Sequence, residues 1–161
     1  MKQSLLSSKY RAKIIEAIGK EIDVAMLYKQ MGNQLENIGY FGSASFFKNE
    51  GDEEMKHYQV WADFMNDMGD VADIPAVKPK TDKIIGLRQA FTVYLNREKE
   101  LMDFYNAWYT DCDDASIMQQ LLFFVEVQRK SVGEAGDFLA TLDRCGSNEA
   151  ALLIFDKEIN G

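Results

Sequence analysis

Apolar residues recur at three- and four-residue steps in four long blocks of the sequence. This spacing places them on one face of an α-helix, so it predicts four long helices. We expect these helices over residues 9–38, 43–69, 82–110 and 115–144, and a short apolar tail predicts a fifth helix over 148–159. The two prolines, Pro75 and Pro79, lie close together, and the long proline-free tracts on either side favour helices over a turn-rich β fold. The predicted fold class is all-α.

Both prolines belong to the stretch 70–81, which lacks the three- and four-residue spacing of apolar residues and is therefore predicted to be a linker. Short turns join the first helix to the second and the third to the fourth, so each pair is expected to be antiparallel. A helix of roughly 27 residues is about 40 Å long, and an extended 12-residue linker spans about the same distance. The linker can therefore return the chain to the far end. The predicted architecture is a single domain over 1–161, a four-helix bundle with one long crossover and a short C-terminal fifth helix.

The net charge of −8 disfavours nucleic acid as a partner and favours cations. The two cysteines, Cys112 and Cys145, form no CxxC pair, which suits a reducing compartment. No apolar run approaches the ~18 residues of a membrane span, and the N-terminus lacks the apolar core of a signal peptide. We therefore expect a cytoplasmic protein that binds neither nucleic acid nor a membrane.

Each of the four helical stripes is interrupted near its middle by a polar residue. The interruptions are Glu21 in the first stripe, Glu54 and His57 in the second, Glu98 in the third and Gln128 in the fourth. Mid-helix positions of equally long helices meet at one depth, so these side chains are expected to converge. Burying three carboxylates together is unfavourable unless cations neutralise them. Oxygen-rich ligands with a single histidine suit iron or manganese better than a structural zinc site.

Glu54 and His57 stand three residues apart, so both can reach one metal ion from the same face of a helix. This Glu-x-x-His spacing is the signature of di-iron carboxylate bundles. The spacing also arises often by chance, and His57 can instead be a core histidine. The metal site is the better interpretation because the only histidine of the chain falls in this motif and every stripe carries a metal-competent residue.

Three further residues have two interpretations each. Glu50 lies one turn before Glu54, and Glu53 directly precedes Glu54. Each is either an accessory iron ligand or relay, or a carboxylate that faces solvent or a cavity. Tyr28 lies two turns after Glu21 on the same face, where it either assists the site or is a buried core tyrosine.

At these residues the chain resembles the ferritin family over essentially its whole length. The match consists of Glu21 with Tyr28, the Glu54-x-x-His57 motif, Glu98 and Gln128, and it resembles the ferroxidase centre of heavy-chain-type ferritins. The resemblance implies that Glu21, Glu54 and His57 hold a first iron. It implies that Glu54 and Glu98 hold a second iron, with Gln128 nearby. The tail LLIFDKEING is similar to the fifth helix of ferritins that assemble as 24-subunit shells.

The activity that this resemblance implies is iron storage with a ferroxidase step. Fe(II) would be oxidised by O₂ or peroxide at a di-iron site, and a ferric mineral would be deposited inside a shell of identical subunits. A haem-binding, bacterioferritin-like protein is an alternative, since Met55 matches the haem-ligating position although a second Glu-x-x-His is missing. A di-iron redox enzyme without storage and a storage subunit that does not itself oxidise iron are also compatible with these residues.

The sequence departs from the family pattern at two places. Val127 and Ser131 stand where bacterial ferritins with a third iron site usually carry glutamates, so a third site would depend on Glu50 and Glu53. Hydrophobic residues, Met118 and Leu121, stand where animal ferritins line their three-fold pores with acidic residues, and Asp113 and Asp114 are the candidate substitutes.

Overall fold

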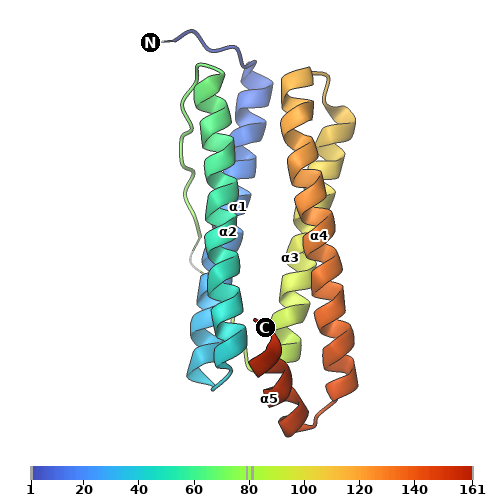
Figure 1. Ribbon diagram of the computed structural model, residues 1–161. Helices are drawn as coiled ribbons and strands as arrows, with labels where there is room; N and C mark the ends of the chain where they lie inside the picture. The colour runs from blue at the N-terminus through green and yellow to red at the C-terminus, as the bar shows by residue number, and fades with distance from the viewer. Residues whose placement is uncertain (1, 79, 81, 161) are drawn as a thin grey trace. The chain divides into compact units, whose positions relative to one another are not determined.

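The computed structural model describes residues 2–78, 80 and 82–160. Met1, Pro79, Thr81 and Gly161 lie outside the described residues, and two of these belong to the predicted linker. The described chain forms helices α1 (Ser8–Asn37), α2 (Phe41–Asp67), α3 (Leu87–Asp111), α4 (Ala115–Cys145) and α5 (Glu149–Glu158), and no strand (Figure 1). The predicted all-α fold class is therefore confirmed.

The chain divides into two compact units between Lys83 and Ile84. In the first unit, α1 and α2 form a hairpin of two helices that lie side by side, and the linker follows α2 (Figure 1). In the second unit, α3 and α4 form another such hairpin, and α5 packs against α4. Each unit therefore positions its own polar residues by pairing two long helices.

Polar side chains and glycines set the helix ends. The Ser7 side chain accepts a hydrogen bond from the Tyr10 amide at 3.3 Å at the start of α1. The side chain of Asp114 accepts hydrogen bonds from the amides of Ser116 and Ile117, so Asp114 is the N-cap of α4. Gly69 follows the C-cap residue Met68 of α2 and adopts a φ of +79°, the left-handed conformation that commonly ends a helix at a glycine.

Helix α3 begins at Leu87, five residues later than the predicted start at 82. Ile84 is 4% exposed, so it belongs to the apolar core although it precedes the helix. The Ile85 amide donates to the side chain of Gln89 at 2.9 Å instead of starting a helical turn. The apolar spacing begins at Ile84, before the helix, because Ile84 is buried by packing, and this explains why periodicity alone placed the helix start too early.

Two glycines allow the backbones of α1 and α2 to approach closely. A Cβ atom added to Gly32 would lie 2.8 Å from the carbonyl oxygen of Ala44. A Cβ atom added to Gly51 would lie 2.9 Å from the carbonyl oxygen of Ala25. Real Cβ atoms do not come this near, so these positions require glycine for packing rather than for backbone freedom.

The linker is fastened to α1 over much of its length. Arg11 pairs with Asp70 at 3.2 Å and with Asp73 at 2.6 Å, and Lys80 pairs with Asp23.

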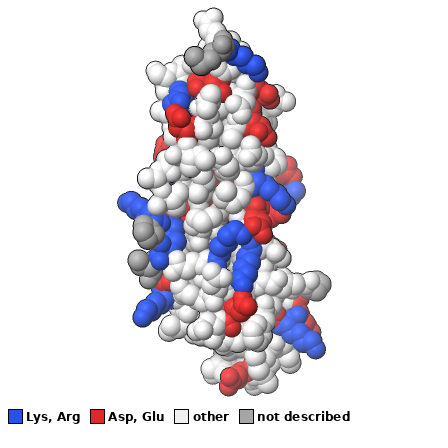
Figure 2. Space-filling model, turned by 90° about the vertical axis from the view of Figure 1, so that its left-hand side faces the viewer, with Lys and Arg blue, Asp and Glu red and all other residues white. Residues whose placement is uncertain are grey.

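Basic and acidic side chains are mixed in small groups on the face shown in Figure 2, without a broad field of one sign. Among the described helices, none combines the length and the apolar character needed to cross a bilayer.

Aromatic rings hold the second unit together. The rings of Tyr105 on α3 and Phe124 on α4 stack with their centroids 4.7 Å apart. Phe155 of α5 lies 5.5 Å from the ring of Phe91 and 6.1 Å from that of Phe138. The short fifth helix is therefore anchored by one aromatic side chain between two others.

Candidate metal centre

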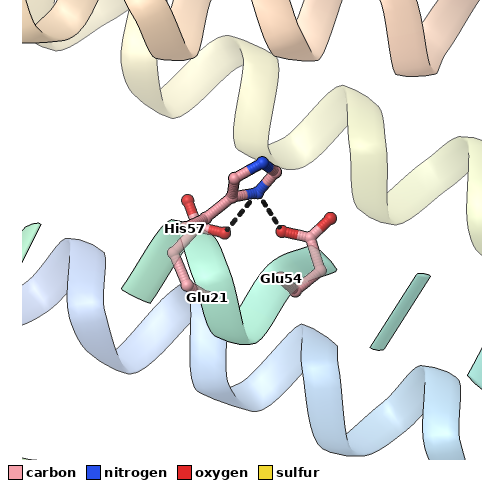
Figure 3. A group of neighbouring side chains, drawn as sticks. All are labelled: Glu21, Glu54 and His57. Carbon is pink, nitrogen blue, oxygen red and sulfur yellow. Dashed lines mark hydrogen bonds and ion pairs between the residues drawn. The ribbon is translucent and has the colours of Figure 1, made fainter. Parts of the chain in front are cut away.

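The first unit brings three predicted ligands together inside its helical hairpin. Glu21 comes from α1, and Glu54 and His57 come from successive turns of α2. One ligand atom from each residue lies within 4.8 Å of the other two (Figure 3). Among the described residues, this is the one group of three or more such side chains with ligand atoms this close.

Geometry and burial both favour a metal ion at this group. Nδ1 of His57 lies 2.7 Å from Oε2 of Glu54 and 3.7 Å from Oε2 of Glu21 (Figure 3). Glu21 is 0% and Glu54 2% exposed, and the side chain of His57 is 12% exposed. Two carboxylates removed from water beside one imidazole nitrogen need a positive charge between them.

In the metal-free protein that positive charge is a proton on His57. Burial alone lowers the pKa of His57, but hydrogen bonds to Glu21 and Glu54, together with their charges, outweigh burial and raise it to about 10. The imidazolium is thus a counter-ion for both carboxylates. A metal ion that takes its place must displace this proton, since the ligating nitrogen has to be neutral.

The donor set determines which cations fit. Two carboxylate oxygens and one imidazole nitrogen suit a divalent ion such as Fe(II), which accepts oxygen and imidazole donors together. Three protein ligands leave coordination positions open for a second ligand or for a reactant. The group can therefore bind a metal ion and leave some coordination positions of that ion free for a reactant.

Glu98 and Gln128 form a second pair within the other unit. Glu98 lies on α3 and Gln128 on α4, and both are 0% exposed. With its amide nitrogen turned toward α3, Gln128 donates to Oε2 of Glu98 at 2.8 Å and to the backbone oxygen of Glu98 at 3.2 Å. Gln128 thereby fixes the orientation of a buried carboxylate, which is how an amide at this position can support a ligand.

Tyr28 is fully buried on α1, seven residues after Glu21. Its ring lies 5.9 Å from that of Phe47 on α2, with the planes tilted by 53°. Tyr28 therefore has the burial and the aromatic neighbour of a core residue. A role beside the metal centre stays a prediction.

The two accessory candidates differ from each other in the structure. Glu50 is half-buried on α2, whereas Glu53 is exposed and forms an ion pair with Lys56 at 2.5 Å. Lys56 was not among the residues expected to take part, although a lysine three residues after a glutamate on a helix is a recognisable signal for such a pair.

The remaining candidate positions differ in their burial. Leu121 is fully buried, so it packs the α3–α4 core, and Met118 is half-buried. The side chain of Asp114 caps α4. Met55, Val127 and Ser131 are all half-buried.

Comparison with known proteins gives consistent results. A bacterial non-heme ferritin of Staphylococcus aureus is 28% identical over 160 residues, covering 96% of this chain and 95% of its own. A ferritin of Pacifastacus leniusculus is 28% identical over 156 residues, covering 89% of this chain and 86% of its own. An open-pore ferritin of Archaeoglobus fulgidus matches with a TM-score of 0.88 at 24% identity, covering 96% of this chain and 97% of that one. An engineered closed form of the same ferritin matches with a TM-score of 0.92.

The structural matches show that the fold is a ferritin-like four-helix bundle with a short C-terminal helix, as predicted. The ferritin family, defined by a ferritin-like domain, matches residues 11–145, which is most of the chain. The protein therefore belongs to the ferritin family.

Proposed function

We propose that this protein oxidises Fe(II) and stores the resulting Fe(III) as a ferric mineral. The observation that carries the proposal is the buried group of Glu21, Glu54 and His57, with one ligand atom of each within 4.8 Å of the others. Membership of the ferritin family supports the same function. Iron is then the substrate and the cargo of the protein rather than a resident cofactor.

The three side chains have distinct tasks in this reaction. Glu21 and Glu54 attract the divalent ion and neutralise its charge, and His57 gives up its proton as the ion binds. Two Fe(II) ions each give one electron to O₂ and become Fe(III). The O₂ takes up these two electrons and two protons and becomes hydrogen peroxide. The protein contributes by holding the substrate ions in a fixed geometry with open coordination positions.

We further propose that Glu98 and Gln128 complete a di-iron site, with Glu54 shared between the two ions. This part rests on the correspondence with the family motif and on the hydrogen bond by which Gln128 orients Glu98. It requires the two hairpins to function as one ferritin-like domain. Tyr28 is the candidate for an additional electron donor, and Glu50 is the candidate for an accessory ligand.

Storage requires an assembly as well as an oxidation site. We propose a closed homo-oligomer, with 24 subunits as the expected number, in the cytoplasm. The family membership and the presence of α5 support this proposal. The mineral would then be kept apart from the rest of the cell.

Adding excess Fe(II) to the purified protein in air, followed by size exclusion with iron and protein read together, tests the proposal. The wild type should oxidise Fe(II) faster than a protein-free control and carry iron in a very large particle. Glu54→Gln and His57→Ala should each oxidise Fe(II) no faster than the protein-free control. Glu126→Gln is the matched control, because Glu126 is an exposed carboxylate on α4 that pairs with Lys130 at 2.8 Å.

Each contrary result has a distinct meaning. Unchanged oxidation rates in both Glu54→Gln and His57→Ala would show that oxidation does not take place at this group. Fast oxidation by a small species that retains no iron would favour a redox enzyme over a storage protein. A wild type no faster than the protein-free control would refute the ferroxidase proposal itself.

A further inference from the structure

An acid-rich stretch of α2, residues 50–54, carries four carboxylates within five positions. The structure gives three of them different partners. Glu54 points to His57 and Glu21 in the metal centre. Asp52 pairs with Lys29 of α1 at 2.5 Å, and Glu53 pairs with Lys56 at 2.5 Å. The stretch is thus not a uniform cation-binding surface.

The Glu53–Lys56 pair neighbours the metal centre in the sequence. Lys56 precedes His57 directly and follows Glu54 by two residues. The side chains of Glu53 and Lys56 are 52% and 69% exposed, so ions in solution can reach both. The side chain of Lys56, like that of an ordinary lysine, is positively charged at neutral pH.

We infer that Lys56 prevents Glu53 from serving as a metal ligand beside the buried centre. The inference rests on the proposed function, since it concerns which carboxylates beside that centre take up metal ions. It also decides between the two interpretations of Glu53 in favour of a paired surface carboxylate.

Two effects act together in this role. A cation that binds Glu53 must break the ion pair, which in an exposed position costs a small amount. The ammonium also repels a divalent ion a few ångströms away, by an amount that is modest in water but doubled by the ion's charge. Together they weaken cation binding at Glu53 by about tenfold.

The test is a titration with Co(II), which has the charge of Fe(II) but is not oxidised by air under these conditions. Binding is followed by calorimetry on the full-length wild type, Lys56→Gln, Glu53→Gln and the double variant. All the substitutions replace exposed side chains, and circular dichroism checks that the helices are retained. Lys130→Gln is the matched control, since Lys130 pairs with Glu126 at 2.8 Å on the surface of α4.

Wild type and Glu53→Gln should bind the same number of Co(II) ions with affinities within about twofold of each other, because Glu53 is not a ligand. In Lys56→Gln, Co(II) should bind at Glu53 about tenfold more tightly than it does in the wild type, although still more weakly than at the buried centre. The double variant should lose this gain, which would assign it to Glu53. Lys130→Gln should behave as the wild type.

Two results would overturn the inference. A Glu53→Gln variant that binds fewer ions than the wild type would show that Glu53 is already a ligand. A Lys56→Gln variant with unchanged weak binding, or one whose gain persists in the double variant, would show that Lys56 does not act on Glu53. Tight Co(II) binding that is lost in Glu54→Gln reports separately on the buried centre, so failure of the proposed function appears in a different part of the titration.

Discussion

Nδ1 of His57 lies 2.7 Å from Oε2 of Glu54, one helical turn earlier on α2. The same nitrogen lies 3.7 Å from Oε2 of Glu21 on α1. A proton on this nitrogen and a metal ion bound to it therefore serve the same two carboxylates. Protons and metal ions compete for one site, and this competition makes both metal binding and stability depend on pH.

Metal binding should tighten as the pH rises. The pKa of His57 is about 10 in the metal-free protein, so one proton leaves for each ion that binds throughout the neutral range. We expect the affinity for Co(II) to rise by about tenfold per pH unit between about pH 6 and pH 8. Calorimetry in buffers of different ionisation enthalpy measures both the affinity and the released proton. A His57→Gln variant should bind more weakly and lose this pH dependence, and a wild type with a flat profile would contradict the assignment.

The stability of the metal-free protein should change in the opposite direction. The pKa of His57 is about 10 in the folded protein against 6.5 for an ordinary histidine. The stabilising contribution of the imidazolium is thus fully present below pH 6.5 and is lost as the pH rises toward 10. We expect the free energy of unfolding of the wild type to fall by up to a few kcal/mol over this range, relative to His57→Gln. Urea unfolding in the presence of a chelator checks this, and equal pH profiles for both proteins would contradict it.

Adding a methyl group at the close approach of α1 and α2 should destabilise the protein. A Cβ at position 51 would lie 2.9 Å from the backbone oxygen of Ala25, so Gly51→Ala must push the helices apart. We expect a loss of about 1–3 kcal/mol in the free energy of unfolding, as for other overpacked sites. Gly133→Ala on α4 is the control, because its Cβ would meet nothing within 4 Å. That control should be neutral or stabilise by up to about 1 kcal/mol, and thermal or urea unfolding of both variants measures the contrast.

Removing the aromatic anchor of α5 should release this helix locally. Phe155 is 8% exposed and its ring packs against Phe91 and Phe138, so Phe155→Ala should cost about 3 kcal/mol in the packing of α5. Hydrogen exchange should show fast exchange over Glu149–Glu158, with protection retained in α3 and α4. Leu153→Ala, at a residue that is 50% exposed, should leave the exchange pattern unchanged. Uniform loss of protection in the Phe155→Ala protein would show instead that the second unit unfolds as a whole.

Much of the fold could be predicted from the sequence because the periodic spacing of apolar residues indicates helices. The all-α class followed from apolar spacing, and so did the ends of α1, α2 and α4 to within two residues. Glu21, Glu54 and His57 were found because a charged residue within an apolar stripe is a local signal. Their close approach in the structure needed only that α1 and α2 pair side by side.

Other features were not accessible because they depend on contacts between distant residues. The start of α3 was placed too early since Ile84 is buried by packing rather than by helix formation. The need for glycine at positions 32 and 51 arises from the neighbouring helix, which the glycines themselves do not indicate. The protonation of His57 depends on Glu21, which lies 36 positions earlier in the sequence but only 3.7 Å away in space.

All three residues of the buried metal group lie within the first hairpin, between positions 21 and 57. During synthesis the N-terminal part of a chain is made and leaves the ribosome first. The nascent protein therefore carries a full set of three donors before α3, α4 and α5 have been translated.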